Sequence, residues 1–256
     1  MSRDLYNKKW RKFLGRIWPF RFIPFVDFVL AAGSLATGNM REESDFDVIV
    51  GVRQGRIFSV RAFCILAFGM FGWRAVHKMR PKPTNPPEST KRIRIFGFHS
   101  GHSDYSGSSD CVCFNHFVTP AAYRLSLPHN DYWNNLYQKL VPVYGSPEAI
   151  QRFYDANADW LGKRRIYKDD PRHKYKKSGW VKKLGEWILS ERSGSNIRTK
   201  GWLGDWLESK LKAVQIKRIK RGLESQAGYK PRIIYNDNEL EFHPDTKRME
   251  LFLKDN

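Results

Sequence analysis

Residues 25–52 read FVDFVLAAGSLATGNMREESDFDVIVGV, and this stretch decides the fold. It holds two apolar runs, 25–33 and 46–52, on either side of a polar segment. Short runs rich in Val and Phe, bounded by Gly and polar residues, are typical of buried β-strands. The segment 37–44 is polar enough to be the loop between them. The stretch therefore predicts two neighbouring strands.

Two aspartates, Asp45 and Asp47, lie at the start of the second run. Because side chains alternate along a strand, both carboxylates point to the same face, about 6.5–7 Å apart. Unpaired carboxylates at this separation repel each other by a few kcal/mol at an effective dielectric of about 20. Hard divalent cations prefer carboxylate oxygens, and paired Mg²⁺ ions serve nucleotidyl transfer in many enzymes. The pair predicts a site for Mg²⁺ or Mn²⁺.

Gly33 and Ser34 end the first run. A strand that ends in Gly-Ser and enters a turn or short helix presents backbone N–H groups and a hydroxyl to an anion. Each feature alone has an ordinary explanation, since Gly-Ser is common in turns and Asp-Phe-Asp also suits an exposed edge strand or a lysine partner. Together, with about ten residues between them, they indicate a nucleotide site.

This order of features resembles the signature of the DNA polymerase β-like nucleotidyltransferase superfamily, in particular its minimal bacterial and archaeal members. The likeness rests on AGS at 32–34 and SDFDVIV at 44–50, covers 20 to about 120 well, and extends weakly to the C-terminus. It implies an α+β nucleotidyltransferase fold, a small mixed β-sheet backed by helices. It further implies Mg²⁺ on Asp45 and Asp47, and contacts from Gly33 and Ser34 to an NTP, with ATP expected first.

The superfamily usually adds a third carboxylate from a neighbouring strand. In the predicted strand 111–119, CVCFNHFVT, the corresponding residue is Asn115. Asp110 is the nearest acid, at the start of the strand and on the opposite parity. Because the third acid often acts as general base on the attacking hydroxyl, three outcomes stay open: slow catalysis, help from Asp110, or an inactive member.

The rest of the chain reads as helices and short strands. Helices are expected at 4–18, 56–73, from 130 onward, at 146–161 and at 200–223, with a further strand at 93–98 and a strand–turn–strand–helix at the end. The composition becomes basic and poor in apolar residues after Leu161. We therefore divide the chain into a catalytic domain, 1–125, and a helical, basic C-terminal region, 126–256, with a terminal β/α element.

The charge balance is strongly basic, with 45 Lys and Arg against 26 Asp and Glu, a net charge of +19. Such an excess favours an anionic partner and counts against polycationic substrates such as aminoglycosides. The segments 163–183 and 217–221 are candidate surfaces for RNA or another polyanion, because Lys and Arg neutralise phosphates and aromatic side chains stack on bases. For 163–183 a solvated linker is the equal alternative.

Two functions follow as expectations. The first is a Mg²⁺-dependent nucleotidyltransferase that moves NMP from an NTP to a hydroxyl of an anionic acceptor such as RNA. The second is a catalytically weak or inactive member that binds nucleotide or RNA, or acts in a toxin–antitoxin-type pair. Three cysteines without a disulfide framework favour the cytoplasm. The apolar run 62–73 is too short to cross a bilayer, so no membrane insertion is expected. The oligomeric state is left open.

Overall fold

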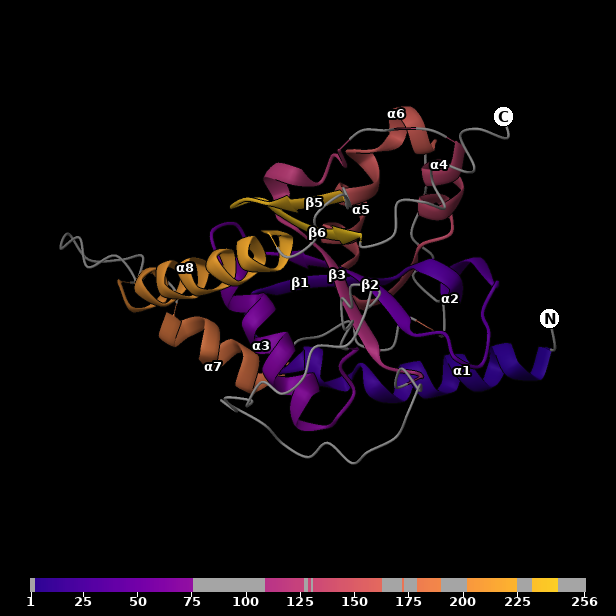
Figure 1. Cartoon of the computed structure of the whole chain (residues 1–256), viewed down its shortest axis with the longest axis horizontal. Helices are drawn as coiled ribbons and strands as arrows, with labels where there is room; N and C mark the ends of the chain where they lie inside the picture. The colour runs from indigo at the N-terminus through magenta and orange to yellow at the C-terminus, as the bar shows by residue number, and fades with distance from the viewer. Residues whose placement is uncertain are drawn as a thin grey trace, which may run out of the picture.

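The computed structural model describes residues 3–75, 109–126, 129, 131–162, 172, 179–189, 202–224 and 232–243. Within them a six-stranded sheet has the order β4-β1-β2-β3-β6-β5 (Figure 1). The strands are β1 Val26–Ala31, β2 Phe46–Val52, β3 Val112–Val118, β4 Val141–Gly145, β5 Arg232–Tyr235 and β6 Glu239–His243. Strands β2 and β3 are parallel and the other neighbours antiparallel, so the mixed sheet of an α+β fold is confirmed.

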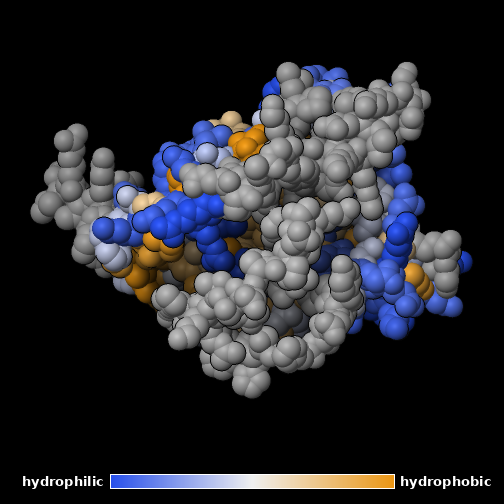
Figure 2. All heavy atoms as spheres, in the orientation of Figure 1, coloured by the Kyte–Doolittle hydropathy of each residue, from blue (hydrophilic) through white to orange (hydrophobic). Residues whose placement is uncertain are grey.

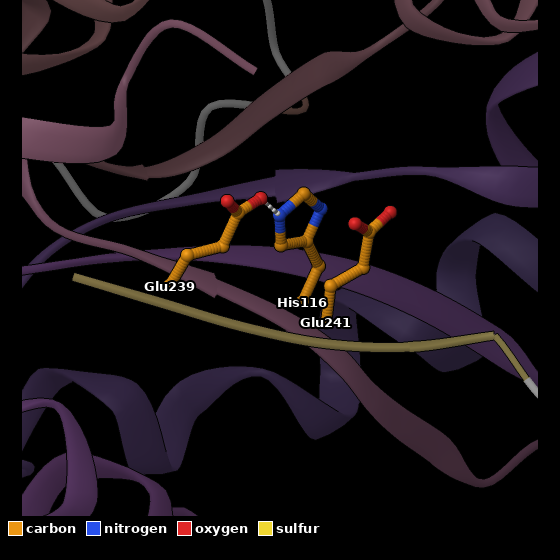
Figure 3. Close-up of side chains that lie close together, drawn as sticks. All are labelled: His116, Glu239 and Glu241. Atoms are coloured by element: carbon orange, nitrogen blue, oxygen red, sulfur yellow. Dashed lines mark hydrogen bonds and ion pairs between the residues drawn. The ribbon is translucent and has the colours of Figure 1, made fainter. Parts of the chain in front are cut away.

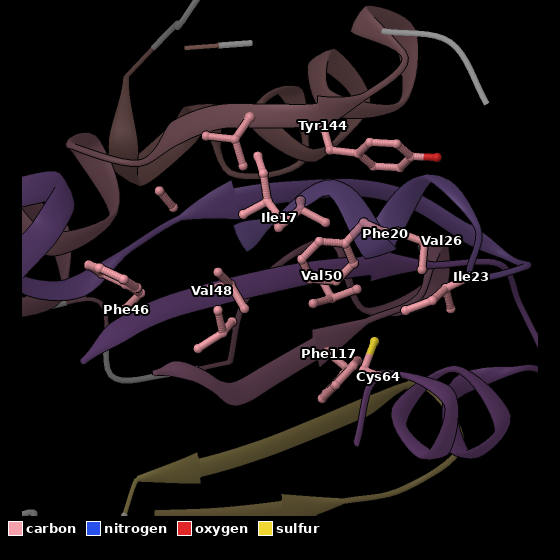
Figure 4. Packing of buried hydrophobic residues seen from close by; sticks show 14 of the residues in the cluster. Ile17, Phe20, Ile23, Val26, Phe46, Val48, Val50, Cys64, Phe117 and Tyr144 are labelled. Carbon is pink, nitrogen blue, oxygen red and sulfur yellow. The ribbon is translucent and has the colours of Figure 1, made fainter. Parts of the chain in front are cut away.

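Helices cover both faces of this sheet (Figure 1). They are α1 Arg3–Arg16, the 3₁₀ turn η1 Trp18–Arg21, α2 Gly33–Thr37, α3 Ile57–Met70, the 3₁₀ turn η2 Pro120–Ala122, α4 Asp131–Gln138, α5 Pro147–Asp155, α6 Ala158–Leu161, α7 Trp180–Leu189 and α8 Trp202–Glu224. Because side chains alternate along β2, Phe46, Val48 and Val50 pack into one core with α1, η1 and α3 (Figure 4). Ile49 faces a second core, lined by α4 and α5.

The stretch that opened the sequence analysis folds as expected. The segments 26–31 and 46–52 form adjacent antiparallel strands, with Ala31 opposite Val48 and Val29 opposite Val50. Both strands lie inside the sheet, flanked by β4 and β3, which explains why their apolar runs are nearly continuous.

Strand β4 was missed, because the segment 140–145 was read as the continuation of a helix. Its sequence, LVPVYG, contains Pro142, which cannot donate a ladder hydrogen bond. The structure places β4 at an edge of the sheet, where such a proline is tolerated. Since β4 pairs with β1 and β6 pairs with β3, strands from both sides of the expected boundary at residue 125 share one sheet.

The expected helix 146–161 begins as predicted, with the Ser146 side chain accepting a hydrogen bond from the Ala149 N–H at 3.1 Å. It is interrupted after α5. The buried Asn157 side chain there donates to the carbonyl of Tyr123 at 2.6 Å and accepts from the N–H of Leu125 at 3.0 Å. Asn157 thus ties the start of α6 to the chain after β3.

Helix α8 packs through a face that its leucines indicate only in part. The spacing of Leu203, Leu207, Leu211 and Val214 predicts one buried stripe; Leu211 packs against the core, whereas Leu203 and Val214 are 40% and 66% exposed. The packed face also carries Glu208, whose carboxylate accepts the N–H groups of Phe58 and Ser59 at 2.8 Å each. These N–H groups open α3 and have no partner within that helix, so a carboxylate satisfies them well.

Several expectations lie outside the described residues: the strand at 93–98, most of 163–183, and the final helix. Helix α7, which begins within the basic tract, was not expected. In the part of the chain that the structure describes, no helix combines the length and the apolar character needed to span a bilayer.

Candidate functional site

The turn after β1 lies directly against the Asp47 carboxylate of β2. Gly33 begins α2 with a φ of +60°, a conformation that side chains disfavour. The N–H of Ala32 donates to the Asp47 carbonyl at 2.9 Å. A Cβ built on Gly33 would overlap the Asp47 carboxylate, 2.9 Å from its Cγ. Glycine is therefore required here for both its conformation and its size, and the structure brings Gly33 and Asp47 together.

Ser34 follows in the first turn of α2 and is half-buried. Within the described residues its hydroxyl makes no hydrogen bond, whereas its carbonyl lies 3.4 Å from the Thr37 hydroxyl. The Ser34 hydroxyl can therefore donate to an incoming anion without first losing a protein partner.

Asp45 and Asp47 are both half-buried. Oδ1 of Asp45 accepts a hydrogen bond from the backbone N–H of Cys111 at 3.2 Å. Oδ1 of Asp47 accepts one from the Asn115 amide at 3.0 Å. Both acids are thus oriented by the neighbouring strand segment, and Asn115 holds the third-strand position expected from the sequence.

An irregularity in β3 brings Asn115 to this place. Asp47 is opposite Cys113, but Ile49 is opposite His116, so β3 carries one extra residue between the two pairs. Such a bulge redirects side chains locally and is common beside functional sites. The Cys113 thiol donates to Oδ1 of Asn115 at 2.8 Å, which leaves the amide nitrogen to donate to Asp47.

Cys113 also belongs to the site, although the alternation of Cys111 and Cys113 in an apolar run predicts only a place in the core. It is buried, but it borders the acids. Burial, followed by the nearby carboxylates of Asp47 and Asp45, raises the pKa of its thiol well above the usual range. The thiol therefore stays protonated at neutral pH and acts as a hydrogen-bond donor, not as a thiolate ligand or nucleophile.

Asp110 has another partner. Lys9 and Lys12 of α1 lie 2.7 Å and 2.5 Å from its two carboxylate oxygens, and Arg16 donates to its carbonyl. Burial alone would raise the Asp110 pKa, but the hydrogen bonds from Lys12 and Lys9 bring it below its ordinary value. Because both oxygens are committed to α1, the structure gives no support to Asp110 as a substitute third acid.

The basic segments are only partly described. Lys182, within the expected tract 163–183, is buried and donates to the Val26 carbonyl and to the Tyr144 hydroxyl, so it does not face a polyanion. The charged residues of 217–221 are exposed on α8. Figure 2 shows this helix as a hydrophilic band, with apolar residues beside it toward α7.

A second polar cluster was not foreseen. His116 of β3 meets Glu239 and Glu241 of β6 (Figure 3). The alternation Glu-Leu-Glu at 239–241 was a local signal, because it repeats the acid–apolar–acid pattern of 45–47. The partner strand is far away in the sequence, so the pattern alone did not reveal the cluster.

The residues of the first cluster fit a hard divalent cation. Asp47 on β2 and Asp45 immediately before it offer carboxylate oxygens, and the missing side chain of Gly33 lets the Asp47 carboxylate lie against the turn. Comparisons of the chain with protein-family models, with curated proteins and with solved structures found no match. The geometry of the site is therefore the basis for assigning a function.

Proposed function

We propose that this protein is a Mg²⁺-dependent nucleotidyltransferase that moves NMP from an NTP to a hydroxyl of an anionic acceptor. ATP is the first nucleotide to test and RNA the first acceptor. The observation that carries the proposal is the close approach of Gly33 to Asp47, in which a positive-φ glycine lets the carboxylate lie directly against the backbone turn. A backbone turn in contact with a carboxylate can bind the phosphates and the cation of one nucleotide.

Each residue has a defined part in this proposal. Asp45 and Asp47 would hold Mg²⁺ or Mn²⁺, which would supply charge neutralisation at the triphosphate and activation of the acceptor hydroxyl. The Gly33 backbone and the Ser34 hydroxyl would bind phosphate oxygens. Asn115 orients Asp47 through its amide. In this proposal the two acids bind the cation, the turn positions the phosphates, and Asn115 of β3 positions Asp47.

The acceptor is inferred from charge. The net charge of +19 would draw an anionic molecule toward the protein. The exposed basic residues of 217–221 on α8 are the described surface best suited to phosphates. An RNA acceptor predicts binding that weakens steeply with salt.

One observation favours a second candidate function. The third-strand position is Asn115, and its amide donates to Asp47, so it offers no carboxylate to accept the proton of an attacking hydroxyl. In this alternative the protein binds MgATP or RNA with little or no transfer, and acts as a regulatory binder.

The test is incubation of the purified protein with each labelled NTP, Mg²⁺ or Mn²⁺, and total cellular RNA and protein, resolved on gels. We expect label on one acceptor class. Asp45→Asn/Asp47→Asn should reduce the transfer by roughly 100-fold or more, because a catalytic metal supplies several kcal/mol of transition-state stabilisation.

A matched control removes two other acids. Asp155 and Asp159 are exposed on α5 and α6, so Asp155→Asn/Asp159→Asn changes the net charge equally without touching the site. This variant should retain transfer. MgATP binding without transfer supports the regulatory alternative, and equal transfer by both double variants contradicts the metal assignment.

A further inference from the structure

Strands β3 and β6 bring three ionisable side chains together. In their antiparallel ladder His116 is opposite Glu241, and Glu239 is opposite Val118. Nε2 of His116 lies 2.9 Å from Oε1 of Glu239. One potential ligand atom from each of the three residues lies within 4.8 Å of the others. Figure 3 shows the imidazole ring between the two carboxylates, which approach it from opposite sides.

All three side chains are shielded from water. The exposed fractions are 3% for His116, 4% for Glu239 and 0% for Glu241. Buried carboxylates are costly unless they are paired or bind a metal ion. Among the described residues, the only ionic partner of Glu239 is His116, and Ser126 donates to its second oxygen at 3.0 Å. The described neighbour that could balance the charge of Glu239 is thus a histidine, which carries a positive charge only when protonated.

The imidazole ring of His116 gives a second observation, separate from the burial of the two carboxylates, that points to a bound ion. Its second nitrogen, Nδ1, is buried and has no hydrogen-bond partner in the described part of the protein. Figure 3 shows this nitrogen on the side of the ring that faces Glu241. A buried ring nitrogen normally has a partner, since its desolvation is otherwise uncompensated. A metal ion beside it would be such a partner.

We propose that His116, Glu239 and Glu241 form a buried site for one divalent first-row metal ion, with Zn²⁺ as the first to test and Mn²⁺ as the second. Imidazole nitrogen with carboxylate oxygens suits these ions, whereas Mg²⁺ prefers oxygen ligands throughout. Bonds of about 2.0–2.2 Å in a tetrahedral site put ligand atoms about 3.4 Å apart. Binding of the ion would therefore require the His116 ring to turn until Nδ1 faces both carboxylates, and the Nε2–Glu239 hydrogen bond would be given up.

The site would have a structural role. The ladder between β3 and β6 contains three residue pairs. The two strands are far apart in the sequence, since β3 ends at Val118 and β6 begins at Glu239. An ion that binds both strands would link the β5–β6 hairpin to the rest of the sheet. Because the site is separate from Asp45 and Asp47, the inference does not depend on the proposed nucleotidyltransferase function.

The test measures metal uptake by the full-length protein. After removal of metals with a chelator, titration with Zn²⁺ in a calorimeter should show about one tight equivalent per chain and a higher melting temperature. His116→Gln should weaken Zn²⁺ affinity by at least about tenfold. His129→Gln is the matched control, because His129 bonds to the Leu125 carbonyl and stacks on Trp160. It should bind Zn²⁺ like the wild type.

A spectroscopic measurement covers the case in which His116→Gln does not fold. Co²⁺ bound to the wild-type protein should give visible d–d absorption without a thiolate-to-cobalt charge-transfer band. Such a band would place the ion on a cysteine and overturn the proposal. So would the absence of tight Zn²⁺ and Mn²⁺ binding, which would leave a Glu–His–Glu hydrogen-bonded cluster.

One variant distinguishes the proposed nucleotide site at Asp45 and Asp47 from the proposed metal site on β3 and β6. Asp45→Asn/Asp47→Asn should lose metal-dependent nucleotide transfer and keep the tight Zn²⁺ equivalent. Loss of that equivalent in this variant would show that the ion lies at the aspartates, and would overturn the site on β3 and β6.

Discussion

Two clusters of acids lie on one sheet, and they differ in exposure and in the distance between their residues along the chain. Asp45 and Asp47 are half-buried and two residues apart, at the start of β2, and Asp47 lies against the turn at Gly33. His116 and Glu239 are almost completely buried and are 123 residues apart. The first cluster can meet a substrate from solvent, whereas the second is enclosed by the fold. Exposure thus separates the cluster that we propose binds a nucleotide from the cluster that we propose holds a structural ion.

The two clusters also differ in what a single substitution leaves behind. Asp47 has a like charge two residues away, so its removal relieves repulsion and disturbs only the hydrogen bond from the half-buried Asn115 amide among the side-chain bonds described above. Glu239 accepts hydrogen bonds from His116 and Ser126, so its removal leaves buried donors poorly paired. The difference can be measured as free energy of unfolding.

The largest effect is expected for Glu239→Gln, which should lower the free energy of unfolding by about 3 kcal/mol, because the hydrogen bonds of His116 and Ser126 lose their charged acceptor. Asp47→Asn should change it by no more than about 1 kcal/mol. Urea unfolding, with the slope m checked for constancy, measures both variants. Equal destabilisation by the two substitutions would contradict the division into a structural and a functional cluster.

Asp110 provides an intermediate case, an acid fixed by lysines. Its lowered pKa means that its contribution to stability is present above the unfolded-state value of about 4 and is lost as the pH falls through the folded-state value. Asp110→Asn should cost about 2 kcal/mol at pH 7, because Lys9 is buried. Unfolding measured from pH 7 to 2.5 should show the difference from wild type shrinking. A constant difference would refute the ion-pair explanation.

The smallest expected effects are those of Gly38→Ala and Gly33→Ala, which distinguish the cost of a positive φ from the cost of a steric contact. Gly38 has a φ of +83° and open space around its Cβ position, whereas Gly33 has a φ of +60° and Asp47 in the way. Gly38→Ala should cost about 1 kcal/mol from backbone strain alone. Gly33→Ala should cost about 1 kcal/mol more and also weaken MgATP binding. Thermal unfolding and calorimetry test both variants, and indistinguishable results would show that Gly33 and Asp47 are not in tight contact.

Features encoded within a short stretch could be predicted. The apolar runs of 25–52 predict β1 and β2. Because these two strands are adjacent, the turn at Gly33 lies against Asp47. The Ser146 cap was predictable because it is a local hydrogen bond. Asn115 was placed by a family resemblance, and the structure puts it beside Asp47.

Features that depend on distant partners were missed. Lys182 is polar in sequence but buried in the fold, where the Val26 carbonyl and the Tyr144 hydroxyl accept from it. The packed face of α8 carries Glu208 because the start of α3 needs acceptors. His116 and Glu239 gave no joint signal, because only the pairing of β3 with β6 brings them together. Residue polarity predicts exposure poorly wherever a buried polar partner exists.

The central claim is that Asp45, Asp47 and the Gly33 turn bind one nucleotide through a divalent cation. Calorimetric titration of ATP, with and without Mg²⁺, tests it most directly. We expect Mg²⁺-dependent ATP binding that Asp45→Asn/Asp47→Asn weakens at least about tenfold and that Asp155→Asn/Asp159→Asn leaves unchanged. A wild-type protein that does not bind MgATP, or equal affinity in both double variants, would contradict the claim.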